Sequence, residues 1–125
     1  MIYIDTHIVL WLYHRRGEGL SEPARRLIEY EPEAFISPIV LLEIDYLHEI
    51  GRTTLGSEPV FKYLKERIGL QVCKKSFIDV IQTASLLSWT RDPFDRIITA
   101  QAKLDRNVLI TKDKIILENY EQAIW

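Results

Sequence analysis

Five short segments of strand-forming residues are spaced along this 125-residue chain, and helix-length segments separate them. Most of the five are continuous apolar runs rather than alternations of apolar and polar residues, which indicates strands buried on both faces. Such strands, joined through helices, build a parallel sheet with helices on both sides. The sequence therefore predicts an α/β fold of three layers, α/β/α. The predicted strands are residues 1–4, 34–36, 70–72, 108–110 and 123–125.

The two clearest helix starts are Ser37-Pro38 and Asp92-Pro93, which each combine a capping side chain with proline at the first helical position. Gly51 is placed to end the first of these helices in the left-handed conformation. No internal repeat, low-complexity tract or linker interrupts the pattern, so we expect residues 1–125 to form a single domain. The predicted helices are residues 7–15, 22–30, 38–50, 57–68, 77–88, 93–105 and 114–120.

The composition excludes several classes of protein. Apolar residues make up 47% of the chain, enough for a full core, and 16 Lys and Arg against 18 Asp and Glu argue against a protein that coats nucleic acid through bulk positive charge. The single cysteine, Cys73, excludes an intrachain disulfide framework and a cysteine-built zinc site. The start MIYIDTH lacks the basic region of a signal peptide, and no apolar run approaches the roughly 18 residues of a membrane span. We expect a cytoplasmic protein without a membrane partner.

Four carboxylates scattered along the chain are expected to meet at one edge of the sheet. Asp5 directly follows the first strand, and Asp113 lies just beyond the strand at 108–110. Glu43 and Asp95 both fall early in predicted helices, and a helix that follows a strand starts at the same edge. Ligands of open parallel sheets bind beyond the carboxyl ends of the strands. These four acids are therefore the candidate site.

Each acid also has a purely structural interpretation. Glu43 interrupts an apolar stretch and could lie on a solvated stripe of its helix. Asp95 could complete a capping box with Asp92, which we interpret as a helix cap outside the site's first layer of ligands. Asp5 and Asp113 could simply cap the helices that follow them. The functional interpretation depends on all four acids reaching one edge.

Carboxylate oxygens are hard ligands suited to Mg²⁺ or Mn²⁺. Without a cation the acids would repel one another, since two charges about 4 Å apart interact by about 4 kcal/mol at an effective dielectric of 20. Their pKa values should therefore rise in the metal-free protein. One or two cations would remove that repulsion, orient a phosphodiester and activate water, so neither histidine nor cysteine is needed as a nucleophile.

The motifs around these acids resemble the PIN-domain family, and in particular the VapC-type toxin ribonucleases of toxin–antitoxin pairs. The resemblance covers nearly the whole chain, and the segment DPFDR at 92–96 is its most specific part. The other motifs that carry it are IDT at 4–6, LEI at 42–44 and LITKD at 109–113. The resemblance implies a five-stranded sheet with the first and fourth strands adjacent, and Mg²⁺- or Mn²⁺-dependent cleavage of RNA phosphodiester bonds.

The resemblance also assigns roles within the site. Asp5 and Asp95 are expected to bind the metal directly, and Glu43 and Asp113 to act through water or on a second ion. It further implies a homodimer and a small antitoxin whose tail enters the active-site groove. The expected supporting residues are Thr6, Thr111 and Asp92, and the candidate RNA contacts are Arg91, Arg96 and Lys112.

Other functions fit less well. Aspartyl-phosphate phosphatases need a second acid two residues after the first strand's aspartate, where this chain has His7, and a phosphorylated receiver domain needs an aspartate after the third strand, where it has Cys73. A solitary PIN nuclease without an antitoxin remains an alternative, as does a non-catalytic PIN-like module that binds RNA or protein. Loss of one of the four acids would mark such a module, and none is missing.

Overall fold

The computed structural model describes residues 1–125, and its five strands form one sheet in the order β3-β2-β1-β4-β5. Every pairing between neighbouring strands is parallel. The predicted parallel sheet and the adjacency of the first and fourth strands are therefore confirmed. The strands are β1 (Ile2–Ile4), β2 (Ala34–Ile36), β3 (Gln71–Val72), β4 (Val108–Ile110) and β5 (Ala123–Ile124).

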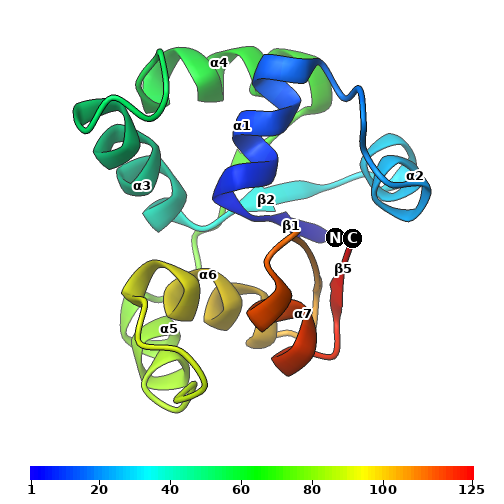
Figure 1. Ribbon diagram of the computed structural model, residues 1–125. Helices are drawn as coiled ribbons and strands as arrows, with labels where there is room; N and C mark the ends of the chain where they lie inside the picture. The colour runs from blue at the N-terminus through cyan, green and yellow to red at the C-terminus, as the bar shows by residue number, and fades with distance from the viewer.

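Seven helices surround the sheet and complete the α/β architecture (Figure 1). In Figure 1, α1, α3 and α4 lie on one side of the strands, and α5, α6 and α7 lie on the other. This arrangement gives the three predicted layers. The helices are α1 (Thr6–Arg15), α2 (Glu22–Tyr30), α3 (Pro38–Glu49), α4 (Ser57–Ile68), α5 (Phe77–Ala84), α6 (Pro93–Lys103) and α7 (Lys114–Asn119).

The sheet is buried between the helical layers, as continuous apolar strands require. All three residues of β1 are buried, and Ile4 pairs in register with the buried Ile110 of β4. The main core cluster runs through both layers and includes Ile8 of α1 and Ile98 of α6. No helix combines the length and apolarity needed to cross a bilayer.

One predicted helix boundary was wrong by a full turn. The helix predicted to run to residue 88 is α5, which ends at Ala84, and Ser76 makes no capping hydrogen bond at its start. Beyond α5 the chain turns, and Leu87 packs in a small separate cluster with Ala84. The bounds of α4 match the prediction, but its cap was not predicted. Its N-cap is Gly56, and the Asp45 side chain of α3 accepts hydrogen bonds from the N–H and Oγ of Ser57, at 2.7 and 2.9 Å.

Candidate active site at the carboxyl edge of the sheet

The pairing of β1 with β4 brings two candidate residues into contact. The Asp5 N–H donates to the Ile110 carbonyl at 3.0 Å, which continues the strand ladder one residue past β1. At that point the Thr111 hydroxyl donates to Asp5 Oδ2 at 2.7 Å. Asp5 Oδ1 accepts the Thr6 N–H at 2.7 Å and so caps α1. One oxygen of Asp5 is therefore held by a backbone N–H and the other by a side-chain hydroxyl.

Asp5 is only 4% exposed. Burial raises the pKa of its carboxyl, and the charge of Asp113 adds to that rise. The hydrogen bond from Thr111, the nearby His7 and the Thr6 N–H act in the opposite direction and lower the pKa. No lysine or arginine forms an ion pair with it. A buried, rigidly held carboxylate without a cationic partner is the arrangement in which an external cation gains most.

Glu43 lies on the inner face of α3 and is 8% exposed, so the interpretation as a solvated stripe is wrong. Burial raises the pKa of its carboxyl, and the charges of Asp5 and Asp92 raise it further. The Thr6 hydroxyl opposes this rise, yet Thr6 Oγ1 is fully buried and has no hydrogen-bond partner. This buried hydroxyl beside Glu43 makes no hydrogen bond of ordinary length and can serve a ligand bound there.

The capping-box interpretation of Asp95 is also wrong. Asp92 Oδ1 caps α6 by accepting the N–H groups of Phe94 and Asp95, at 2.8 and 3.3 Å. The N–H of Asp92, which a capping box would direct to the Asp95 carboxylate, donates instead to the Thr90 hydroxyl at 3.2 Å. The Asp95 side chain is thus left free of protein hydrogen bonds.

The electrostatic surroundings of Asp95 indicate that other acids lie near it. The pKa of Asp95 is raised to about 7, mainly by burial. The negative charges of four other acids also raise it: Asp92, Asp5, Asp113 and Glu43. Four other acids are therefore close enough to act on one carboxylate. The predicted meeting of Asp5, Glu43, Asp95 and Asp113 at one edge agrees with this mutual influence.

Asp113 serves the fold and faces the site. Its Oδ1 caps α7 by accepting the N–H groups of Ile115 and Ile116, at 2.8 and 3.1 Å. Its own N–H donates to Thr111 Oγ1 at 3.0 Å, so the hydroxyl that holds Asp5 also fixes Asp113. Because the charge of Asp113 raises the pKa of both Asp5 and Asp95, Asp113 lies near these two acids.

The site is a set of converging acids rather than a closed cage. No group of three or more His, Cys, Asp or Glu side chains is arranged to hold a metal ion as it stands. The donor set nevertheless fits a hard divalent cation, since it offers carboxylate oxygens and the orphaned Thr6 hydroxyl. Mg²⁺ commonly keeps several waters and binds through one or two carboxylates, which an open edge of this kind permits.

The three predicted RNA contacts differ in whether the protein already holds their side chains. Arg91 is exposed, whereas Arg96 Nε donates to the Thr90 carbonyl at 2.6 Å and ties the loop before α6 to the helix. The Lys112 ammonium lies 4.5 Å from the ring of Trp11 and 5.1 Å from that of Trp125. Thr90 is a residue beside the candidate site that the sequence reasoning missed, and no motif marks it, because its hydrogen bonds depend on the fold of the loop.

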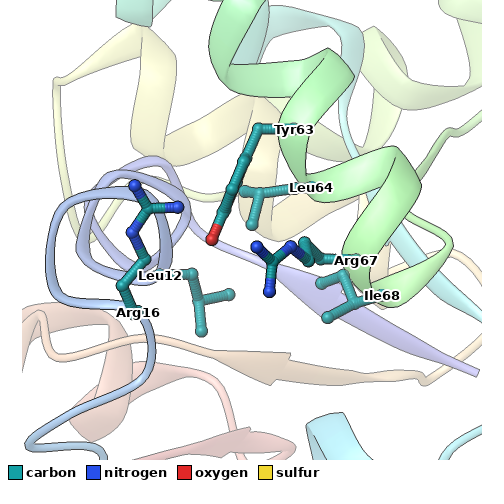
Figure 2. Close-up of a pocket in the computed structure, with 6 residues that line it drawn as sticks. All are labelled: Leu12, Arg16, Tyr63, Leu64, Arg67 and Ile68. Carbon is teal, nitrogen blue, oxygen red and sulfur yellow. The ribbon is translucent and has the colours of Figure 1, made fainter.

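One cavity of the structure lies away from the acids. It is formed between α1 and α4, has a volume of about 510 Å³, and none of the four candidate acids lines it (Figure 2). The four acids line none of five pockets in the structure, and they lie at or near the carboxyl edge of the sheet.

The fold and this edge define an α/β protein with an acidic site beyond the carboxyl ends of a parallel sheet. The family model described as the PIN domain matches residues 2–122, so the chain belongs to the PIN domain family.

Two solved structures share the fold. A toxin–antitoxin complex from Klebsiella pneumoniae is 20% identical, with a TM-score of 0.68 over 100% of this chain and 97% of that chain. VapBC2 from Rickettsia felis, bound to a DNA fragment from its promoter, is 17% identical, with a TM-score of 0.66 over 99% of this chain and 96% of that chain. No curated protein matches the sequence.

Proposed function

We propose that residues 1–125 form a single PIN domain that is a metal-dependent endoribonuclease, the toxin of a VapBC-type toxin–antitoxin pair. The observation that carries this proposal is the placement of Asp5 and Asp113 around one hydroxyl, that of Thr111, which donates to Asp5 and accepts the Asp113 N–H. The raised pKa values of Asp5, Glu43 and Asp95, to which neighbouring acids contribute, support a site of four acids. Membership of a family whose proteins are in general nucleases supports the reaction class. The reaction is hydrolysis of a phosphodiester bond in RNA, in the cytoplasm.

The geometry suggests a division of labour among the acids. Asp5 is held at both oxygens, so it would supply a fixed direct ligand. Asp95 has no protein hydrogen bond and would turn toward the ion as the second direct ligand. Glu43 and Asp113 would orient the attacking water or hold a second ion, with Thr6 and Thr111 as hydrogen-bonding supports.

A bound Mg²⁺ or Mn²⁺ would supply charge neutralisation, polarisation of the phosphodiester and a lowered pKa for the attacking water. The acids of this chain would place that ion over the carboxyl edge of β1 and β4. Exposed Arg91 lies one residue before the α6 cap and would contact an RNA phosphate. Arg96 and Lys112 would contribute positive potential from their anchored positions.

The partners are proposed by likeness to the two structural neighbours, both of which are toxin–antitoxin assemblies by name. A small antitoxin would bind this chain and cover the acidic edge with its tail. We also propose a homodimer, for which the exposed apolar residues Leu42 and Tyr46 of α3 and its C-cap Ile50 offer a surface.

The test is RNA cleavage with Mn²⁺, in the presence and absence of EDTA. Asp5→Asn should abolish cleavage, while the matched control Asp79→Asn, a change at an exposed aspartate of α5, should leave it intact. Equal cleavage by wild type and Asp5→Asn would assign the activity to another site or a contaminant. Cleavage of no RNA substrate by the wild type would favour the non-catalytic binding module.

A further inference from the structure

The cavity between α1 and α4 combines an apolar floor with two cationic walls. Leu12, Leu64 and Ile68 line it together with Arg16, Tyr63 and Arg67. In Figure 2 the Tyr63 ring stands between the two guanidinium groups, and its hydroxyl points into the cavity. The Arg16 and Arg67 guanidinium carbons lie 4.4 and 5.0 Å from the centre of that ring.

Neither arginine has an acidic partner. The ion pairs of the structure involve the N-terminus, Arg25, Arg26 and Lys75 as cations, and no Asp or Glu lines the cavity. The Tyr63 ring holds both guanidinium groups in place while leaving their N–H edges for a ligand. Two guanidinium groups and a hydroxyl around one cavity form a site for an anion.

Helix dipoles explain only part of this charge. Arg16 is the C-cap of α1 and Arg67 lies in the last turn of α4, where cations balance the partial negative charge of a helix end. Each helix end carries roughly half a negative charge, whereas each arginine carries a full positive one. The cavity therefore keeps about one net positive charge after both helix ends are balanced.

The backbone at Arg16 also points to a role for its side chain. Arg16 adopts the left-handed conformation, with φ of 55°, and Gly17 follows it with φ of 87°. Glycine adopts the left-handed region at little cost, whereas a residue with a side chain is strained there. The chain thus carries an arginine at a position where glycine would be more stable, and that arginine borders the cavity.

The floor identifies the kind of anion. A phosphate of a nucleic-acid backbone needs cations and hydrogen-bond donors but gains nothing from Leu12, Leu64 and Ile68. A glutamate or aspartate next to an apolar residue satisfies both halves of the cavity at once. We propose that this cavity, named here the Arg16–Arg67 site, binds a partner polypeptide through a carboxylate side chain and an adjacent apolar side chain.

The test titrates two acetylated dipeptide amides, Leu-Glu and Leu-Gln, and inorganic phosphate into the isotopically labelled full chain. The NMR signals of the Arg16 and Arg67 Nε–Hε groups report contact directly. We expect Leu-Glu to shift both signals and to bind about tenfold more tightly than Leu-Gln, since a charged hydrogen bond to arginine is lost in the amide. Inorganic phosphate should bind more weakly than Leu-Glu.

Arg67→Gln should weaken Leu-Glu binding about fivefold or more, whereas Arg52→Gln, at an exposed arginine outside the cavity, should not change it. Equal binding of the two dipeptides, equal binding by wild type and Arg67→Gln, or no shift of either arginine signal would overturn the proposal. Tighter binding of phosphate than of Leu-Glu would overturn the peptide assignment in favour of a phosphate site. The measurement uses neither RNA nor metal, so its outcome is independent of the proposed nuclease activity.

Discussion

Replacing Asp95 with asparagine should stabilise the metal-free protein at high pH. Burial and four neighbouring acids raise the pKa of Asp95 from its ordinary value of 3.8 to about 7. A group whose pKa is higher in the folded state favours folding while it is protonated, and this contribution is lost as the pH rises through about 7. The wild type should therefore lose stability between about pH 4 and pH 7, and an uncharged asparagine should not.

The size of the effect follows from the same values. At 1.36 kcal/mol for each pKa unit, the difference between 3.8 and about 7 corresponds to at most about 4 kcal/mol. Asp95 is partly exposed, and solvent screening reduces that figure, so we expect the variant to gain about 1–2 kcal/mol at pH 8 in EDTA. The asparagine breaks no hydrogen bond, because the carboxylate of Asp95 accepts none from the protein.

Urea unfolding in EDTA at pH 4 and pH 8 measures this gain. The variant should match the wild type at the lower pH and exceed it at the higher one, and Asp79→Asn should show no such pH-dependent gain. Saturating Mn²⁺ should stabilise the wild type more than the variant, since the ion binds the folded state through Asp95. A variant less stable than the wild type at both pH values would refute the electrostatic reasoning.

Three further changes test individual contacts by urea unfolding. Thr111→Val, which removes the 2.7 Å hydrogen bond to Asp5, should destabilise the protein by about 1–3 kcal/mol; an unchanged midpoint would show that this bond contributes nothing. Asp45→Ala leaves the start of α4 at Ser57 without its cap and should lower stability by about 1 kcal/mol. Unchanged stability would show that water replaces the side chain fully. Asp92→Ala should lose about 1 kcal/mol through the uncapped start of α6, while Asp92→Asn should lose much less, and equal losses would contradict a capping role.

The elements that the sequence predicted well are those with strong local signals. Ser37-Pro38 and Asp92-Pro93 open α3 and α6 where predicted, because a capping side chain and a proline act within one turn of the chain. The strand at 108–110 matches β4 in both bounds, since Asn107 and Thr111 border an unbroken apolar run. Local chemistry decides these positions, and no distant contact competes with it.

The features that the sequence did not predict depend on contacts between distant residues. Asp45 caps α4 across 12 residues, and its own helix gives no sign of this. Thr90 frees Asp95 from a capping box because the loop before α6 folds back on itself. The four candidate acids and the sheet edge beside them could be named from the sequence, but their hydrogen bonds follow from tertiary structure.

The sequence left open, for each acid, whether it caps a helix or binds a ligand. For some of these acids the two roles are compatible. An ionised carboxylate has about four lone-pair positions, and a cap occupies only one or two of them. Asp5 accepts one hydrogen bond at each oxygen, so each oxygen keeps a free lone pair for a cation. Asp113 uses Oδ1 alone in its cap and leaves Oδ2 free. For these two acids the structural bonds fix the direction of the remaining lone pairs, which prepares the site rather than competing with it. Asp95 differs, because a capping box would have turned its carboxylate back onto the helix, and only its release by Thr90 makes it available.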